Sequence, residues 1–546
     1  MIKAIRGIVS FAIFLIYLTL FVFLPALIGN FLSSFSLFQG APLIIRALTT
    51  GGTAAVIIAA LFLLLTLLFG RLYCSFLCPL GAFQDFFIML SGKYRKLKGR
   101  YTISMPLFRY FITITAIGLF VTVSPVLFTL LEPFSFFGRI SGLLIRPGGI
   151  AFANGLSRLL ENFNIYLTPP VIPKISSFHI LSILITTGLI AYAAFIKGRI
   201  YCNTLCPVGS VLGAISRFAL YNPRINPETC TACGICEKGC RAECISSKHY
   251  HIDLSRCVSC FDCISRCPHG AVKYTRKSAV SRQAVSADAV SGAAISENTF
   301  NQESLTPLPQ SIATHQTITR RYFIKQGSAI GAVLLLTAGV PSAAGAFLGR
   351  EKPRFTPIIP PGAESLKRFI SRCTGCGMCM QVCPTGVIAY SKIEERSHGI
   401  LQANLRYSRA FCEYECNACT RVCPSGALNP LTVKKRQQTK IGEVNLNKDL
   451  CVVFDKYQAC GACAEHCPTG AVRMEPYILN LSKPVIQPEY CIGCGHCEYV
   501  CPTRPIRAIT VEGLVAHEPR KIRPEETKEG KDKASKAEKG SKGFAF

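Results

Sequence analysis

The sequence predicts a bundle of membrane-spanning α-helices joined to small α+β domains that are organised around cysteines. Three observations lead to this fold class. Long apolar runs recur through residues 1–200, the rest of the 546-residue chain is more polar, and 29 cysteines follow short, regular spacings. A chain of this length holds several domains. So many regularly spaced cysteines indicate metal ligation rather than a disulfide framework.

Four apolar runs are each about long enough to cross a bilayer as a helix, near residues 8–28, 54–69, 110–131 and 178–196. Lysines and arginines precede the first run, lie between the second and third, and follow the fourth. Because such residues favour the cytoplasmic side, we expect the N-terminus and residues 198–320 to be cytoplasmic in a bacterial inner membrane. Residues 1–215 would then form a four-helix membrane domain.

The second and fourth runs end in the same motif. Residues 70–81 read GRLYCSFLCPLG and residues 198–209 read GRIYCNTLCPVG, which match at eight of twelve positions. We call these stretches the twin motifs. Both fall after an even number of crossings, so they should meet at the cytoplasmic surface of the membrane. Their cysteines predict one four-thiolate site, which an iron–sulfur cluster, another metal or a redox dithiol would suit: Cys74, Cys78, Cys202 and Cys206.

Residues 216–275 carry two runs, CTACGICEKGC and CVSCFDCISRCP, with the C-x2-C-x2-C-x3-C spacing of bacterial [4Fe–4S] proteins. In that pattern three cysteines hold one cluster and the fourth holds the other; zinc motifs come as separated pairs. Arg241 stands where proline is expected, and Cys244 is a substitute candidate for Cys240. The predicted ligand sets of this cytoplasmic ferredoxin domain are Cys230, Cys233, Cys236 and Cys267, and Cys257, Cys260, Cys263 and Cys240.

Residues 276–318 are rich in Ser, Ala, Val, Gln and Thr and predict a flexible linker. Residues 319–349 then place Arg320 and Arg321 before an apolar stretch that ends at Ala346. This segment resembles a twin-arginine export signal, and the alternative is a fifth transmembrane anchor. Either way the chain crosses outward, so residues 350–546 are expected to be periplasmic.

Residues 350–515 contain four more cysteine runs, each ending in Cys-Pro. The outer two have regular spacing and the inner two have a stretched first gap, so we expect a nested pairing, with sequential pairing as the alternative. The four predicted [4Fe–4S] ligand sets are Cys373, Cys376, Cys379 and Cys501; Cys491, Cys494, Cys497 and Cys383; Cys412, Cys416, Cys419 and Cys467; and Cys451, Cys460, Cys463 and Cys423. The Lys-, Glu- and Gly-rich residues 516–546 predict a disordered basic tail.

Several other functions find no support in the sequence. No CxxCH motif predicts c-type haem, and no Gly-rich dinucleotide or phosphate loop is present. Much of the net charge of +29 lies beside the apolar runs and in the tail, so we do not expect nucleic-acid binding. His179 and Glu132, at the predicted periplasmic helix ends, are candidate quinone contacts, and ordinary surface roles are the alternative.

These motifs resemble known families. Residues 1–275 resemble NapH, a membrane ferredoxin with four spans and two CxxxCP motifs that are also found in NosR and CcoG. Residues 317–515 resemble NapG and the related MauM, which carry a twin-arginine signal and four cluster motifs. The chain therefore looks like a fusion of two proteins that are normally separate. The resemblance implies quinol dehydrogenase activity that passes electrons from the quinone pool to a periplasmic reductase or cytochrome in anaerobic respiration.

Two alternatives stay open at this point. A cytoplasmic ferredoxin could feed electrons outward through the same clusters, or the chain could supply electrons for maturation of a periplasmic metalloenzyme. In each case we expect six [4Fe–4S] clusters on 24 cysteines, an additional centre of undecided type at the twin motifs, lipid around the helices and quinone as the substrate of the leading hypothesis.

Overall fold

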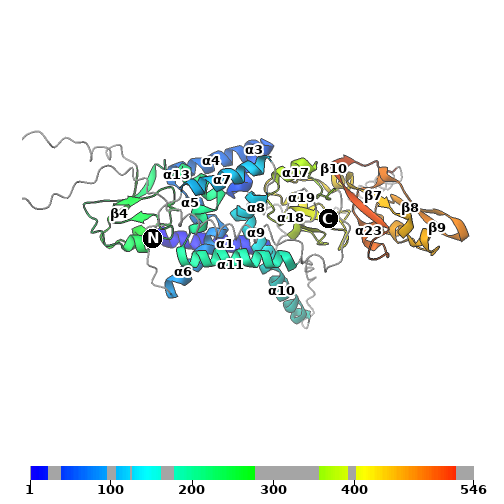
Figure 1. Ribbon diagram of the computed structural model, residues 1–546, viewed down its shortest axis with the longest axis horizontal. Helices are drawn as coiled ribbons and strands as arrows, with labels where there is room; N and C mark the ends of the chain where they lie inside the picture. The colour runs from blue at the N-terminus through cyan, green and yellow to red at the C-terminus, as the bar shows by residue number, and fades with distance from the viewer. Residues whose placement is uncertain are drawn as a thin grey trace, which may run out of the picture. The chain divides into compact units, whose positions relative to one another are not determined.

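The computed structural model describes residues 2–22, 38–94, 106–122, 126–161, 177–276, 356–391 and 401–523 (Figure 1). The predicted linker and export signal, including Arg320 and Arg321, lie outside the described residues. Within the described residues, the segments from 1–275 and 356–523 belong to one compact unit.

The N-terminal part is helical, as predicted. Two helices, α1 (Ile2–Val22) and α11 (Ser177–Lys197), are long and apolar enough to cross a membrane by length and composition. The other two predicted runs contain the shorter apolar helices α4 (Thr53–Phe69) and α7 (Pro106–Thr122). Four membrane crossings therefore stay a prediction. The remaining helices here are α3 (Gly40–Thr50), α5 (Leu72–Phe76), α6 (Pro79–Tyr94), α8 (Val126–Leu131), α9 (Pro133–Ile140), the π-helix η1 (Ser141–Ile145), α10 (Arg146–Glu161), α12 (Ile200–Thr204) and α13 (Pro207–Ser216).

The helical structure is interrupted in the same way at both twin motifs. The short helices α5 and α12 end just before the second cysteine of each motif, and Pro79 and Pro207 begin α6 and α13. Proline suits the first turn of a helix, because it needs no amide partner there. Each motif is thus a helix–break–helix unit rather than one continuous helix.

The first cysteine-rich domain is a small α+β module. Its elements are β1 (Tyr221–Ile225), α14 (Ile235–Lys238), β2 (Ile245–Ser246), β3 (His251–Ile252), α15 (Asp262–Arg266) and β4 (Val272–Arg276). β1 pairs with β4, and β2 pairs antiparallel with β3. We call residues 221–276 the first module.

The second cysteine-rich domain repeats this pattern in two halves, and we call residues 356–523 the second module. The first half holds α17 (Leu366–Arg372), α18 (Met378–Gln381), β5 (Ile388–Tyr390), β6 (Ala403–Leu405), α19 (Ala418–Arg421) and α20 (Val433–Gln437). The second half holds β7 (Thr439–Leu446), η4 (Lys448–Leu450), α21 (Val452–Asp455), α22 (Ala462–Glu465), β8 (Val472–Pro476), η5 (Ile478–Asn480), β9 (Ser482–Ile486), η6 (Pro488–Tyr490), α23 (His496–Val500) and β10 (Ile509–Pro519). Its pairs β5–β6, β7–β10 and β8–β9 are all antiparallel.

The second module extends further than predicted. The sequence places the start of the tail at residue 516, but β10 continues to Pro519 and pairs there with β7. Arg520 is buried and donates to the Gln437 carbonyl oxygen at 2.6 Å. Arg523 is also buried, with its guanidinium carbon 4.7 Å from the centre of the Tyr490 ring. These contacts bury basic side chains that composition alone assigns to solvent.

Two apolar cores hold these elements together. One includes buried residues of α1 and α9 together with most of the buried second module. The other includes the four twin-motif cysteines, cysteines of the first module, Phe136 and Ile140 of α9, and Tyr390 of β5. Cysteines of the twin motifs and of both modules thus lie in or against these two cores.

Candidate cysteine-bound metal centres

All 29 cysteines lie within the described residues, and none forms a disulfide. In the first module the cysteines gather around two cavities. One cavity is lined by Cys230, Cys233, Cys236 and Cys267, which is the ligand set predicted from the spacing. A fourth thiol from the distant run thus joins three from the tight run, as a [4Fe–4S] cluster requires.

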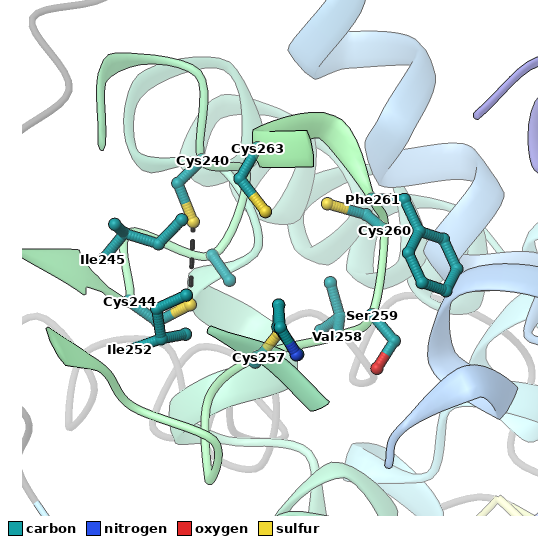
Figure 2. Close-up of a pocket in the computed structure, with 12 residues that line it drawn as sticks. Cys240, Cys244, Ile245, Ile252, Cys257, Val258, Ser259, Cys260, Phe261 and Cys263 are labelled. Atoms are coloured by element: carbon teal, nitrogen blue, oxygen red, sulfur yellow. Dashed lines mark hydrogen bonds between the residues drawn. The ribbon is translucent and has the colours of Figure 1, made fainter. Parts of the chain in front are cut away.

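The other cavity of the first module holds five cysteines instead of four (Figure 2). Cys240, Cys257, Cys260 and Cys263 line it as predicted, and Cys244 joins them. The Sγ atoms of Cys240 and Cys244 lie 3.6 Å apart, and this hydrogen bond lowers the pKa of the Cys240 thiol to about 7. A readily ionised Cys240 fits the ligand role, because the thiolate is the form that binds metal.

The second module overturns the nested pairing. Cys376 and Cys379 of the first run interact electrostatically with Cys423 of the second run, and Cys419 interacts with Cys383. Cys463 of the third run interacts with Cys501 of the fourth, and Cys467 lines a cavity with the fourth run's cysteines. The sets that the structure brings together are Cys373, Cys376, Cys379 and Cys423; Cys412, Cys416, Cys419 and Cys383; Cys451, Cys460, Cys463 and Cys501; and Cys491, Cys494, Cys497 and Cys467.

Strand pairing is the physical reason for sequential order. The β5–β6 pair folds the second run back onto the first, and the β8–β9 pair folds the fourth run back onto the third. The symmetric lengths of the gaps between the first two cysteines of each run predict nested pairing instead. The third run, however, accommodates its extra residues locally, in the short helix α21.

Left-handed glycines shape several of these cysteine runs. Gly234, Gly377 and Gly495 have φ between 73° and 76° and each directly precedes the helical turn that carries the third cysteine. Residues with a Cβ atom are strained in this conformation. Backbone amides also point at the sulfurs: Gly493 N lies 3.3 Å from Cys491 Sγ, a contact that stabilises a thiolate ligand.

The twin motifs bring their four cysteines together, as predicted. Cys206 interacts electrostatically with Cys74, Cys78 and Cys202. All four are 3–5% exposed and belong to one apolar core, so the site lies in the interior of the helical part. The predicted position of this site at the cytoplasmic surface of the membrane stays a prediction.

The arginine of each twin motif donates a hydrogen bond to the other motif. Arg71 of the first motif donates to the Cys202 carbonyl oxygen of the second at 3.1 Å. Arg199 of the second donates to the Cys74 carbonyl oxygen of the first at 2.5 Å. The final glycine has the same role in each motif, because a Cβ atom on Gly81 or Gly209 would collide with the carbonyl oxygen of the first cysteine in its own motif. The repeated Arg, Cys, Pro and Gly therefore build one two-fold-like site.

The site is suited to negative charge. Arg71 is fully buried, and among the described residues its hydrogen-bond partners include no carboxylate. Its Nη2 lies 3.8 Å from Cys74 Sγ, and its Nε has no partner. A buried cation needs a compensating anion, which thiolates around a metal centre supply. The second module contains a similar pair of a buried arginine and a thiol, because the guanidinium of buried Arg436 lies 3.2 Å from Cys412 Sγ.

Arg241, which replaces the expected proline, ties the first module to the helices. Its guanidinium forms ion pairs with Asp85 of α6 at 2.7 Å and with Asp262 of α15 at 2.5 Å. Its carbonyl oxygen accepts the Arg199 amide at 2.8 Å. Proline could make neither ion pair, so the departure from the common pattern has a local structural explanation.

The two candidate quinone contacts have structural roles in the described residues. Glu132 is buried and caps α9 by accepting the amides of Phe134 and Ser135. The His179 ring stacks on Tyr390, with ring centres 5.9 Å apart. A quinone site at these residues stays a prediction.

Arginines at the twin motifs are the site residues that the sequence did not predict. Arg71 and Arg199 are among the eight shared positions of the twin motifs, so the repeat itself carried the signal. Arg109 adds a third buried guanidinium, which donates to the Gly209 carbonyl oxygen at 2.7 Å. No repeat marks Arg109, which only the tertiary contact identifies.

Comparisons with known proteins find 4Fe-4S domains in two parts of the chain. A family model described as a 4Fe-4S binding domain matches residues 52–98 and 178–226, which contain the twin motifs. Models described as 4Fe-4S dicluster domains match residues 372–428, 411–471 and 458–504. The range 372–428 encloses the first and second cysteine runs, and the range 411–471 encloses the second and third. The range 458–504 encloses the fourth run and the last three cysteines of the third. The chain thus contains ferredoxin-type 4Fe–4S domains.

Several curated proteins are similar over parts of the chain. The putative electron transport protein YccM of Escherichia coli is 25% identical over 215 residues, covering 39% of this chain and 54% of its own length. The ferredoxin-type protein NapF of the same species is 27% identical over 175 residues, covering 32% and 95%. The methylamine utilization ferredoxin-type protein MauM of Methylobacillus flagellatus is 28% identical over 203 residues, covering 35% and 80%. No solved structure matches significantly.

Proposed function

We propose that this chain is a membrane-bound iron–sulfur electron-transfer protein that oxidises quinol and passes the electrons to a periplasmic reductase or cytochrome. The observation that carries the electron-transfer role is the gathering of thiols into separate sets of four on ferredoxin-type modules. The cysteine sets fit [4Fe–4S] clusters in donor chemistry and number. Bound clusters would supply reversible one-electron transfer, and the protein supplies their position and environment.

The chain's own residues act in three ways in this proposal. Cysteines hold the clusters, backbone amides and buried arginines stabilise negative charge on the sulfurs, and apolar packing excludes water. Each property influences a reduction potential. The printed names of YccM, NapF and MauM, which describe electron transport and ferredoxin-type proteins, support the same role.

The test is to purify the full chain in detergent with its clusters and mix it anaerobically with a reduced menaquinol analogue. We expect the visible absorption of the clusters to bleach, and their electron paramagnetic resonance (EPR) signals to appear, as dithionite causes. Clusters that dithionite reduces but quinol leaves oxidised would refute quinol oxidation. A purified chain without iron and sulfide would refute the electron-transfer role itself.

A further inference from the structure

The twin-motif cysteines lie between the two cysteine-rich modules, and residues of the chain connect them to both. We propose that they hold an iron–sulfur redox centre that relays electrons directly from the first module to the second within this chain. The relay rests on the proposed electron-transfer function but needs no quinone or partner subunit to join the modules.

On one side, Arg71 connects the twin-motif site to the first module. Its guanidinium lies 3.8 Å from Cys74 Sγ and donates to the carbonyl oxygens of Ser255 at 3.1 Å and Arg256 at 3.5 Å. The next residue is Cys257, which lines a first-module cavity and interacts electrostatically with Arg71. One side chain thus contacts a twin-motif thiol and the backbone beside a cysteine of the first module.

On the other side, helix α9 connects the site to the second module. The hydroxyl of Tyr201, which precedes Cys202, donates to the Leu131 carbonyl oxygen at 2.7 Å, immediately before the Glu132 cap of α9. Further along α9, Gly138 packs against the carbonyl oxygen of Cys376, and a Cβ atom at this position would collide with it. Gln381 Nε2 also lies 3.4 Å from the Gly138 carbonyl oxygen.

Packing fills the space between these contacts. Twin-motif cysteines, Cys260 and Cys263 of the first module, and Tyr390 of the second module share one apolar core. Continuous packing favours electron transfer, because tunnelling falls steeply with distance and falls faster across gaps than through packed atoms. The same core keeps water away from the central thiols, which are at most 5% exposed.

The test uses the full chain, loaded with its clusters and reconstituted in lipid vesicles. Dithionite outside is the electron donor, and trapped ferricyanide is the acceptor. Electrons released as dithionite is oxidised to sulfite reduce ferricyanide to ferrocyanide, which is followed by loss of colour. We expect wild-type chain to decolourise the vesicles. Absence of this flux, with clusters that dithionite reduces in detergent, would overturn the relay.

Two variants separate the parts of the proposal. The Cys74→Ser/Cys202→Ser double variant should lower the iron and sulfide content per chain and abolish the flux. Gly138→Ala should leave iron and sulfide unchanged but lower the flux at least tenfold, because alanine separates α9 from Cys376. Alanine otherwise favours a helix over glycine, so helix propensity would not explain a loss.

Gly148→Ala in α10 is the matched control, because no atom lies within 4 Å of its added Cβ, and its flux should equal wild type. Unchanged iron in the double variant would show that the twin motifs hold no iron centre and would overturn the proposal. Unchanged flux in Gly138→Ala would show that electrons do not pass by way of α9, and it would also overturn the proposal. The quinol assay above is read separately: failure there with intact flux refutes quinol oxidation and leaves the relay standing.

Discussion

Arg241 offers a sharp test of how the first module is attached to the helices. We consider Arg241→Leu, which keeps much of the side-chain bulk and removes the charge. The substitution breaks the ion pairs to Asp85 and Asp262, whose side chains are 13% and 1% exposed. Asp85 retains Arg6 and Arg199 at 2.8 Å each, whereas Asp262 retains, among the described residues, only a 3.6 Å contact to the more exposed Lys3.

The magnitude follows from this asymmetry. Removing one partner of a buried ion pair costs about 3–5 kcal/mol. Since Asp85 stays paired, most of the loss comes from Asp262, and we expect about 3 kcal/mol. At about 1.4 kcal/mol per factor of ten, this is about a hundredfold increase in the opening of the contact between the module and the helices.

Hydrogen–deuterium exchange measures that opening directly, because the Arg199 amide is bonded to the backbone oxygen of residue 241. We expect exchange about a hundredfold faster in Arg241→Leu. Arg224→Gln is the control, since Arg224 donates locally to Asn222 within the first module; its exchange at Arg199 should match wild type. Rates within threefold of wild type in Arg241→Leu would refute the docking role of Arg241.

Three further predictions concern separate sites. Burial, reinforced by the charge of Arg436, lowers the pKa of His517 to about 4; the unfolded chain therefore binds the extra proton first, and stability should fall by up to about 3 kcal/mol as the pH drops from 6.5 to 4. Thermal unfolding should show this slope in wild type and lose it in His517→Gln; equal slopes would contradict it. Gly495→Ala should destabilise the second module by several kcal/mol, because the residue has φ of 76° and its Cβ would collide with Tyr407; unchanged thermal unfolding would contradict this. Arg71→Gln should lower the reduction potential of the twin-motif centre in an EPR-monitored titration, since it removes a buried positive charge. An unchanged reduction potential would show that Arg71 does not influence that centre.

Local spacing predicted which cysteines lie close together in the first module. One predicted set of the first module lines a common cavity, and the other lines a second cavity together with Cys244, because the cysteines of each set lie within short runs and one return crossing. The nested pairing in the second module was wrong, because gap symmetry carries no information about which strands pair. The antiparallel pairs β5–β6 and β8–β9 decide that question.

The four cysteines of the twin-motif site can be identified from the sequence alone, because the same twelve-residue pattern occurs twice and places them at matching positions. Only the tertiary structure showed that each motif's arginine serves the other motif and that the site is buried between two modules. The replacement of proline by Arg241 is likewise visible in the sequence, but its partner Asp85 is distant in the chain. Pairwise contacts between distant residues leave no periodic or spacing signal, so the fold alone reveals them.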